Sequence, residues 1–138
     1  MIAAGPWAGR VLAELGLPLT VVRKVLFWIG TRDDSLFRRD RFPVYIMKTL
    51  DGEFYGFPVI DPAGHKVAQP DGGALVADPA NVDRTVTAAD ESDVRNFVRT
   101  HLPAVAGPVC RSKVCLYTRT PDCHFLIDRH PQHGHVVL

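Results

Sequence analysis

The sequence has little net charge and no long apolar run, and each shortage excludes a class of protein. The 138 residues carry a formal net charge of +1, so nothing indicates a nucleic acid or an anionic membrane as partner. No apolar run reaches the roughly 18 residues of a membrane span, because Arg23 and Lys24 interrupt the longest one. The first ten residues lack the basic region and apolar core of a signal peptide. We expect no membrane partner and no nucleic-acid partner.

Cysteine is also scarce. The three cysteines are an odd number and cannot form a complete disulfide framework, which favours a reducing cytoplasm. Hydrophobic residues make up 46% and charged residues 22% of the chain, as in ordinary globular proteins. A chain of this length can bury one core. It opens on "MIAAG" and closes on "HVVL", which we interpret as the end of one strand and an interrupted second strand. We therefore expect an internal piece of a larger protein.

Strand patterns outnumber helical ones. The β-branched and aromatic run from Thr20 to Ile29 predicts a strand, and residues 44–49 and 53–57 flank the turn signal "LDG", which predicts a hairpin. A polar helix with Thr87 or Asp90 as its cap is expected to stop before Pro103. Further expectations are a helix from Pro6 to Gly16, a loop over 70–86, and strands over 65–69, 112–120 and 124–128. The fold class is α+β, with a largely antiparallel or mixed sheet and covering helices.

The stretch from Val109 to His135 contains all three cysteines and four of the six histidines. Structural zinc sites use two close ligand pairs, such as C-x-x-C with H-x-x-x-H. No cysteine pair of this kind occurs here, and the run "DRHPQHGH" has the composition of a solvated turn. We therefore predict no metal site.

A thiol site is the better interpretation of the same stretch. Alternate side chains of a strand share a face, so Lys113, Cys115 and Tyr117 are expected to point one way. A nearby cation favours the thiolate, which is the nucleophilic form of cysteine. Residue types alone leave a second interpretation open, in which Cys115 is a small buried apolar residue.

The run "KVCLYTRTPDCHFLIDRHP" resembles the C-terminal part of the monomeric sarcosine oxidase and N-methyltryptophan oxidase family, flavoenzymes of the D-amino-acid-oxidase superfamily. The segments "AAGPWAGRVLAELGLPL", "FPVYIMKTLDGEFYGFP" and "GHKVAQPDGG" resemble other family segments in the same order. The resemblance covers nearly the whole chain. It implies that residues 1–18 are a remnant of the FAD-binding domain, that 19–128 form the substrate domain, and that 129–138 begin the return to the FAD-binding domain.

The resemblance also implies roles for individual residues. Family members hold FAD covalently through a cysteine sulfur, and the motif places that cysteine at Cys115. The matching strand–turn–helix assigns Gly5 and Trp7 to cofactor binding. Tyr55 and Tyr117 match positions that line the substrate pocket.

Lys66 matches the family lysine that promotes the reaction of the flavin with oxygen. A fixed cation at that place would stabilise negative charge that develops on oxygen. The residue pattern alone leaves a simpler interpretation open, because lysines on edge strands discourage aggregation.

Two departures from the family pattern stand out. Pro70 occupies the position of a histidine that contacts the substrate carboxylate in members such as sarcosine oxidase, and Gln69 or His65 is a weak substitute. The G-x-G-x-x-G fingerprint of dinucleotide-binding domains is missing. We therefore expect this piece alone to bind no FAD, to be inactive and to self-associate.

The resemblance implies an FAD-dependent oxidase that acts on a small secondary amine or N-methyl amino acid and on molecular oxygen. The products would be an imine, then an aldehyde, and hydrogen peroxide. Two alternatives stay open: a flavin dehydrogenase of the same superfamily, and a non-catalytic or metal-binding domain.

Overall fold

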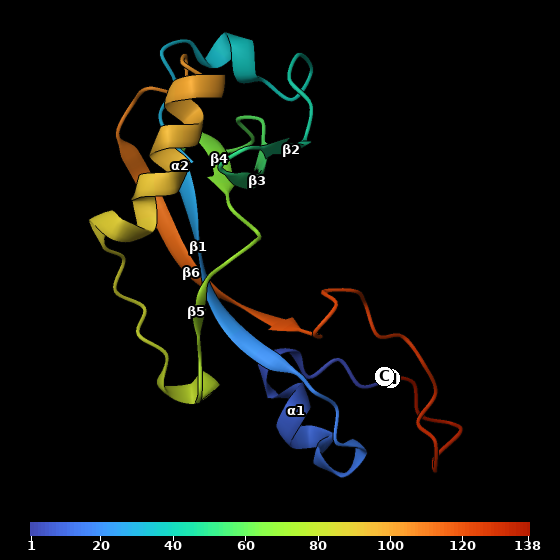
Figure 1. The fold of residues 1–138 in the computed structure, drawn as a ribbon. Coiled ribbons are helices and arrows are strands. Elements are labelled where there is room, and N and C mark those ends of the chain that lie inside the picture. The colour runs from blue at the N-terminus through green and yellow to red at the C-terminus, as the bar shows by residue number, and fades with distance from the viewer. The chain divides into compact units, whose positions relative to one another are not determined.

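The computed structural model describes residues 1–138, which divide into two compact units (Figure 1). Unit 1 contains Met1–Arg23, Gly73–Asp83 and Leu116–Leu138, and unit 2 contains Lys24–Gly72 and Arg84–Cys115. The secondary structure is an antiparallel sheet with few helices, so the predicted α+β class is confirmed.

Unit 2 is built on the antiparallel sheet. Its strand order is β2-β3-β4-β1, and β6 also pairs with β1. The predicted hairpin is confirmed, because β2 pairs with β3 across the turn at "LDG". The strand predicted from Thr20 to Ile29 has the same bounds in the structure. The five strands are β1 (Thr20–Ile29), β2 (Tyr45–Thr49), β3 (Gly52–Phe57), β4 (His65–Ala68) and β6 (Val109–Arg119). The first residues of β1 and the last residues of β6 belong to unit 1.

Helix α2 (Ala88–His101) packs on one face of this sheet (Figure 1). It starts at the predicted place, because Thr87 and Asp90 form a capping box that satisfies free backbone N–H groups of the first turn. Val94, Phe97 and Val98 form its buried stripe and join a core that includes side chains of β1, β3 and β4. Burying each such side chain contributes about 1.5–3 kcal/mol. With 14 residues, α2 is the longest helix, and none of the helices has the length and apolarity needed to cross a bilayer.

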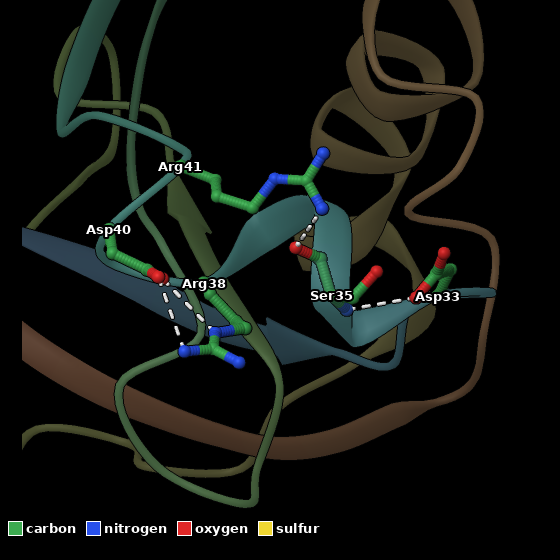
Figure 2. Close-up of polar contacts among 5 residues, drawn as sticks. All are labelled: Asp33, Ser35, Arg38, Asp40 and Arg41. Carbon is green, nitrogen blue, oxygen red and sulfur yellow. Dashed lines mark hydrogen bonds and ion pairs between the residues drawn. The ribbon is translucent and has the colours of Figure 1, made fainter.

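Local polar contacts hold the connection between β1 and β2 (Figure 2). The Asp33 carboxylate caps a short 3-10 turn by accepting a hydrogen bond from the Ser35 amide at 2.9 Å. Arg38 donates to Asp40 at 3.0 and 3.2 Å, and Arg41 donates to the Ser35 carbonyl at 3.4 Å. These contacts satisfy the polar groups of the loop, while its aromatic residues turn toward the core.

Those aromatic residues surround a buried histidine. The rings of Phe37 and Phe42 lie 5.3 and 5.6 Å from the His65 ring, and Tyr45 stacks on it at 5.7 Å. The Tyr45 hydroxyl is 3.0 Å from Nε2 of His65, whereas Nδ1 has no hydrogen-bond partner. His65 has no exposed surface. Burial therefore lowers the pKa of its imidazole from 6.5 to about 4.

Unit 1 contains the chain's first helical turns. The helix predicted from Pro6 to Gly16 is correct only in part, because α1 (Ala8–Val11) is flanked by 3-10 turns. Gly16 ends this segment with a left-handed φ of 58°, which glycine adopts without strain. The loop predicted over 70–86 is wrong at β5 (Ala74–Leu75), which pairs with Val22 and Arg23 of β1.

The strand predicted over 124–128 is also wrong. Cys123 has a left-handed φ of 59°, so the chain turns sharply out of β6, and no strand lies beside the following residues. Phe125 and Ile127 are accordingly 96% and 81% exposed. The strands interpreted in "MIAAG" and "HVVL" are reduced to an isolated bridge between Arg129 and Val137 and a hydrogen bond from the Ile2 amide to the Val137 carbonyl.

The buried imidazole predicts a specific dependence of stability on pH. Between pH 6.5 and 4 the unfolded state binds a proton at His65, whereas the folded state does not. The free energy of unfolding therefore falls as the pH falls. The free energy of unfolding should fall by about 3 kcal/mol in total, because one unit of pKa shift corresponds to about 1.4 kcal/mol. Urea unfolding of the protein at several pH values measures it.

The variant His65→Leu should flatten this part of the pH profile, because it removes the proton-binding group from both states. His124→Leu is the matched control, since His124 is exposed, and its profile should follow the wild type. Equal losses of stability in the wild type and in His65→Leu between pH 6.5 and 4 would contradict the assignment.

Candidate functional site

The two faces of the unit 2 sheet differ in what covers them. On β1 and β4, Phe27 and Val67 point into the core and are 1% and 0% exposed. Their neighbours Trp28 and Lys66 are only half-buried, because successive strand residues point to opposite faces. We call the side that carries Trp28 and Lys66 the open face.

Lys66 lies in the middle of the open face. In the sheet register it is opposite Phe57 of β3 on one side and opposite Trp28 of β1 on the other. Its ammonium nitrogen is 4.7 Å from the centroid of the Phe57 ring and 5.4 Å from that of Trp28. Because β4 lies between β3 and β1, Lys66 is on an interior strand. The interpretation of Lys66 as an edge-strand lysine is therefore wrong.

Tyr55 belongs to the same face. It lies two residues before Phe57 on β3, and the two rings meet edge to face at 6.2 Å. It is half-buried and stands opposite Ile46 of β2, which is 74% exposed. The structure thus connects Tyr55 to Lys66 through the Phe57 ring.

Cys115 is a free, half-buried cysteine on β6. Arg111, on the same strand, places its guanidinium carbon 4.1 Å from the Trp28 ring centroid, so this side of β6 belongs to the open face. Lys113 and Cys115 follow at alternate positions and share that side. Val114, between them, is buried in the core on the other side. The open face therefore carries the predicted thiol, the predicted lysine and the predicted Tyr55.

The remaining predicted site residues belong to unit 1. Tyr117 is half-buried on the last part of β6. Gly5 adopts a left-handed φ of 54° at the first 3-10 turn, and Trp7 is 43% exposed. The Gly5 turn and the exposed Trp7 ring are therefore accessible within unit 1.

His65 cannot contact a substrate on the open face. It points into the core with no exposed surface, which argues against the role of weak substitute considered for it from the sequence. Elsewhere in the chain, no group of three or more histidine, cysteine or acidic side chains is arranged to hold a metal ion.

Sequence reasoning missed four residues around the open face: Phe57, Asp61, Arg111 and Trp28. Trp28 contacts two cations, and Arg111 forms an ion pair with Asp61 at 2.6 Å. The alternation in "VLFWI" separates Trp28 from Phe27, but only the pairing of β1 with β4 and β6 identifies which cations it meets.

The family described as FAD dependent oxidoreductase (DAO) matches residues 1–138. The chain belongs to this family.

Within the family, the chain is similar to enzymes named for N-methyl amino acids. It is 36% identical to monomeric sarcosine oxidase of Streptomyces avermitilis over 96% of the chain and 35% of that protein. It is 34% identical to human peroxisomal sarcosine oxidase and 31% identical to N-methyl-L-tryptophan oxidase of Citrobacter koseri, in both cases over the whole chain. The chain covers 37% and 36% of these two relatives, so it spans a little over a third of their length.

Solved structures of two oxidases share the fold. Fructosamine oxidase from Aspergillus fumigatus superposes with a TM-score of 0.68 at 20% identity, over 98% of this chain and 34% of its own. Glycine oxidase from Geobacillus kaustophilus gives a TM-score of 0.64 at 20% identity, over 99% and 34%.

The residues of the open face fit the ring end of a flavin. Aromatic rings, a free half-buried thiol and several cations share one side of the sheet, which suits a flat, electron-accepting ring. The pyrophosphate of FAD needs backbone N–H groups at a glycine-rich turn, and the sequence has no G-x-G-x-x-G. The chain therefore offers partners for one end of the cofactor.

Proposed function

We propose that residues 1–138 belong to an FAD-dependent oxidase of N-methyl or other secondary amino acids, of the sarcosine type. The observation that carries the proposal is the match, over 96–100% of this chain, to relatives named for sarcosine and N-methyltryptophan. The open face supports it, because Cys115, Lys66 and Tyr55 lie on one side of the sheet. Residues 19–128 would form the substrate domain, with 1–18 and 129–138 belonging to the FAD-binding domain. The three free cysteines are compatible with a reducing setting such as the cytoplasm.

Each residue then has a definite task. Cys115 would hold the flavin ring through a thioether, with Gly5 and Trp7 contributing to the cofactor site. Tyr55 and Tyr117 would line the substrate pocket. When bound, the flavin ring would accept a hydride, two electrons with one proton, from the C–H bond next to the amine nitrogen while the nitrogen loses a proton, and oxygen would take up the two electrons and two protons to give hydrogen peroxide. The imine would then be hydrolysed by water to an amine and an aldehyde.

Lys66 would act in the oxygen half of the reaction. Its ammonium is fixed between two aromatic rings, so it needs little reorganisation when negative charge develops on oxygen. Fixed charges of this kind stabilise developing charge more effectively than mobile water does.

Covalent attachment at Cys115 is testable by colour. Acid precipitation of the full-length protein should leave yellow flavin in the pellet, and Cys115→Ser should lose that colour. Cys110→Ser and Cys123→Ser are matched controls, since both cysteines are exposed, and should keep it. A yellow Cys115→Ser pellet beside a colourless Cys123→Ser pellet would disprove the assignment.

The oxygen role of Lys66 is testable by rapid mixing. Lys66→Met in the full-length protein should slow reoxidation of the reduced flavin by the equivalent of about 2–4 kcal/mol, because one preorganised charge is lost. Anaerobic reduction by the amine should change far less. Lys48→Met, at an exposed position of β2, serves as the control. Unchanged stopped-flow reoxidation in Lys66→Met would show that the lysine is structural.

Residues 1–138 alone should bind no FAD and oxidise no amine, because the pyrophosphate has no glycine-rich turn to meet. The exposed apolar side chains of the isolated piece should favour self-association. Titration with FAD while flavin fluorescence is followed measures the first expectation, and size-exclusion chromatography measures the second. Saturable quenching at micromolar protein would show that the chain suffices for binding.

A further inference from the structure

Trp28 lies between two cations on the open face. The Lys66 ammonium is 5.4 Å from its ring centroid and the Arg111 guanidinium carbon is 4.1 Å from it. Both distances are within the roughly 6 Å at which a cation is attracted by the face of an aromatic ring. Tryptophan is the aromatic residue that provides the strongest attraction of this kind.

The contacts of Lys66 restrict where its ammonium can lie. A lysine side chain has four flexible carbons and carries a point charge at the end, so the position of the charge is set by what it meets. Trp28 and Phe57 flank Lys66 from the two neighbouring strands, and both rings are within reach of the ammonium. The two rings together favour one position of the charge over the open face.

Trp28 is in turn held by a second contact. Arg111 stacks on the ring from β6, and its guanidinium donates to the Asp61 carboxylate at 2.6 Å. The Asp61 carboxylate also accepts a hydrogen bond from the Ala63 amide at 2.8 Å. The hydrogen bond from Arg111 holds the pKa of the Asp61 carboxyl below its usual range, so the pair stays charged at neutral pH. A chain of contacts therefore runs from Asp61 through Arg111 and Trp28 to Lys66.

We infer that Trp28 is a positioning residue that fixes the Lys66 ammonium for the reaction of the reduced flavin with oxygen, and that Arg111 holds Trp28 in place. The inference rests on the proposed function, because it assumes that Lys66 acts on oxygen. Trp28 itself is assigned no contact with substrate or oxygen.

The test measures reoxidation in the full-length protein. The flavin is reduced with dithionite under anaerobic conditions and mixed with oxygen in a stopped-flow instrument, so the identity of the amine does not matter. Trp28→Leu should slow reoxidation by about threefold to thirtyfold, the range expected for the loss of one cation–π contact. Trp28→Phe should keep most of the rate, and Phe125→Leu, at a 96% exposed aromatic position, should keep all of it.

A double variant separates positioning from a general structural effect. If Trp28 acts through Lys66, then Trp28→Leu combined with Lys66→Met should be no slower than Lys66→Met alone, because coupled residues are not additive. If the double variant were slowed by the product of the two single-variant factors, the inference would be overturned. Site-specific fluorination of the Trp28 ring weakens the cation–π attraction while preserving shape. It should slow reoxidation progressively even if Trp28→Leu folds poorly, and rates that do not respond to fluorination would likewise overturn the inference.

A second readout needs no flavin chemistry. In protein labelled with ¹³C at the lysine ε-carbon, the Lys66 signal is identified by its loss in Lys66→Met. The ring currents of Trp28 and Phe57 should place its ε-protons upfield of those of exposed lysines, and Trp28→Leu should move them back. An unshifted Lys66 signal in the wild type would contradict the inference.

The outcomes also separate this inference from the proposed function. If Lys66→Met slows reoxidation and Trp28→Leu does not, the oxygen role of Lys66 stands and the positioning role of Trp28 is wrong. If Lys66→Met reoxidises as fast as the wild type, the oxygen role fails and the inference fails with it.

Discussion

The antiparallel pairing of β4 with its two neighbours is the constraint on which the rest of unit 2 depends. This register aligns Lys66 with Phe57 and Trp28 in one row, and the pleat sends the adjacent His65 to the opposite face. A slip of one residue would exchange the two faces, placing an ammonium in the core and an imidazole on the open face. An unpaired charge in an apolar core costs several kcal/mol. The buried positions of Val67 and Phe27 therefore fix the functional face as well as the core.

The same register places His65 in the core, which costs stability. His65 is fully buried and one ring nitrogen lacks a partner, a defect that costs about 1–3 kcal/mol. Stacking against Tyr45 and edge contacts with Phe37 and Phe42 offset part of it. Gly56, opposite Tyr45 in the hairpin, has no side chain, and a Cβ there would overlap the Tyr45 hydroxyl and lie 2.7 Å from the Lys66 carbonyl. The aromatic cluster around His65 thus needs a glycine on β3 in order to close.

Local sequence signals made part of the fold predictable. The strand from Thr20 to Ile29, the hairpin and the capped helix α2 each follow from residue preferences within a short window. β5 has only two residues and forms because its backbone meets the start of β1. A strand this short has no alternating hydrophobic pattern that could predict it from the sequence. The run 124–128 has strand composition but no neighbouring strand, and pairing partners outweigh propensity. Cys115 was singled out by its strand pattern, and Lys66 and Tyr55 were predicted through the family resemblance. The contacts of Trp28, in contrast, depend on a register between distant segments.

Pro70 helps to set the end of β4. Pro70 has no backbone N–H and cannot extend the hydrogen-bonded ladder, and β4 accordingly ends at Ala68. The chain beyond is held by other contacts: the Lys24 ammonium donates to the Asp71 carbonyl, and the Asp71 carboxylate accepts from the Glu53 amide at 3.3 Å. Lys24 is 6% exposed, so this contact lies in the interior at the end of the sheet. The sheet end in this chain is therefore closed by backbone and lysine contacts, while Lys66, two residues before the strand ends, contacts the rings of Trp28 and Phe57.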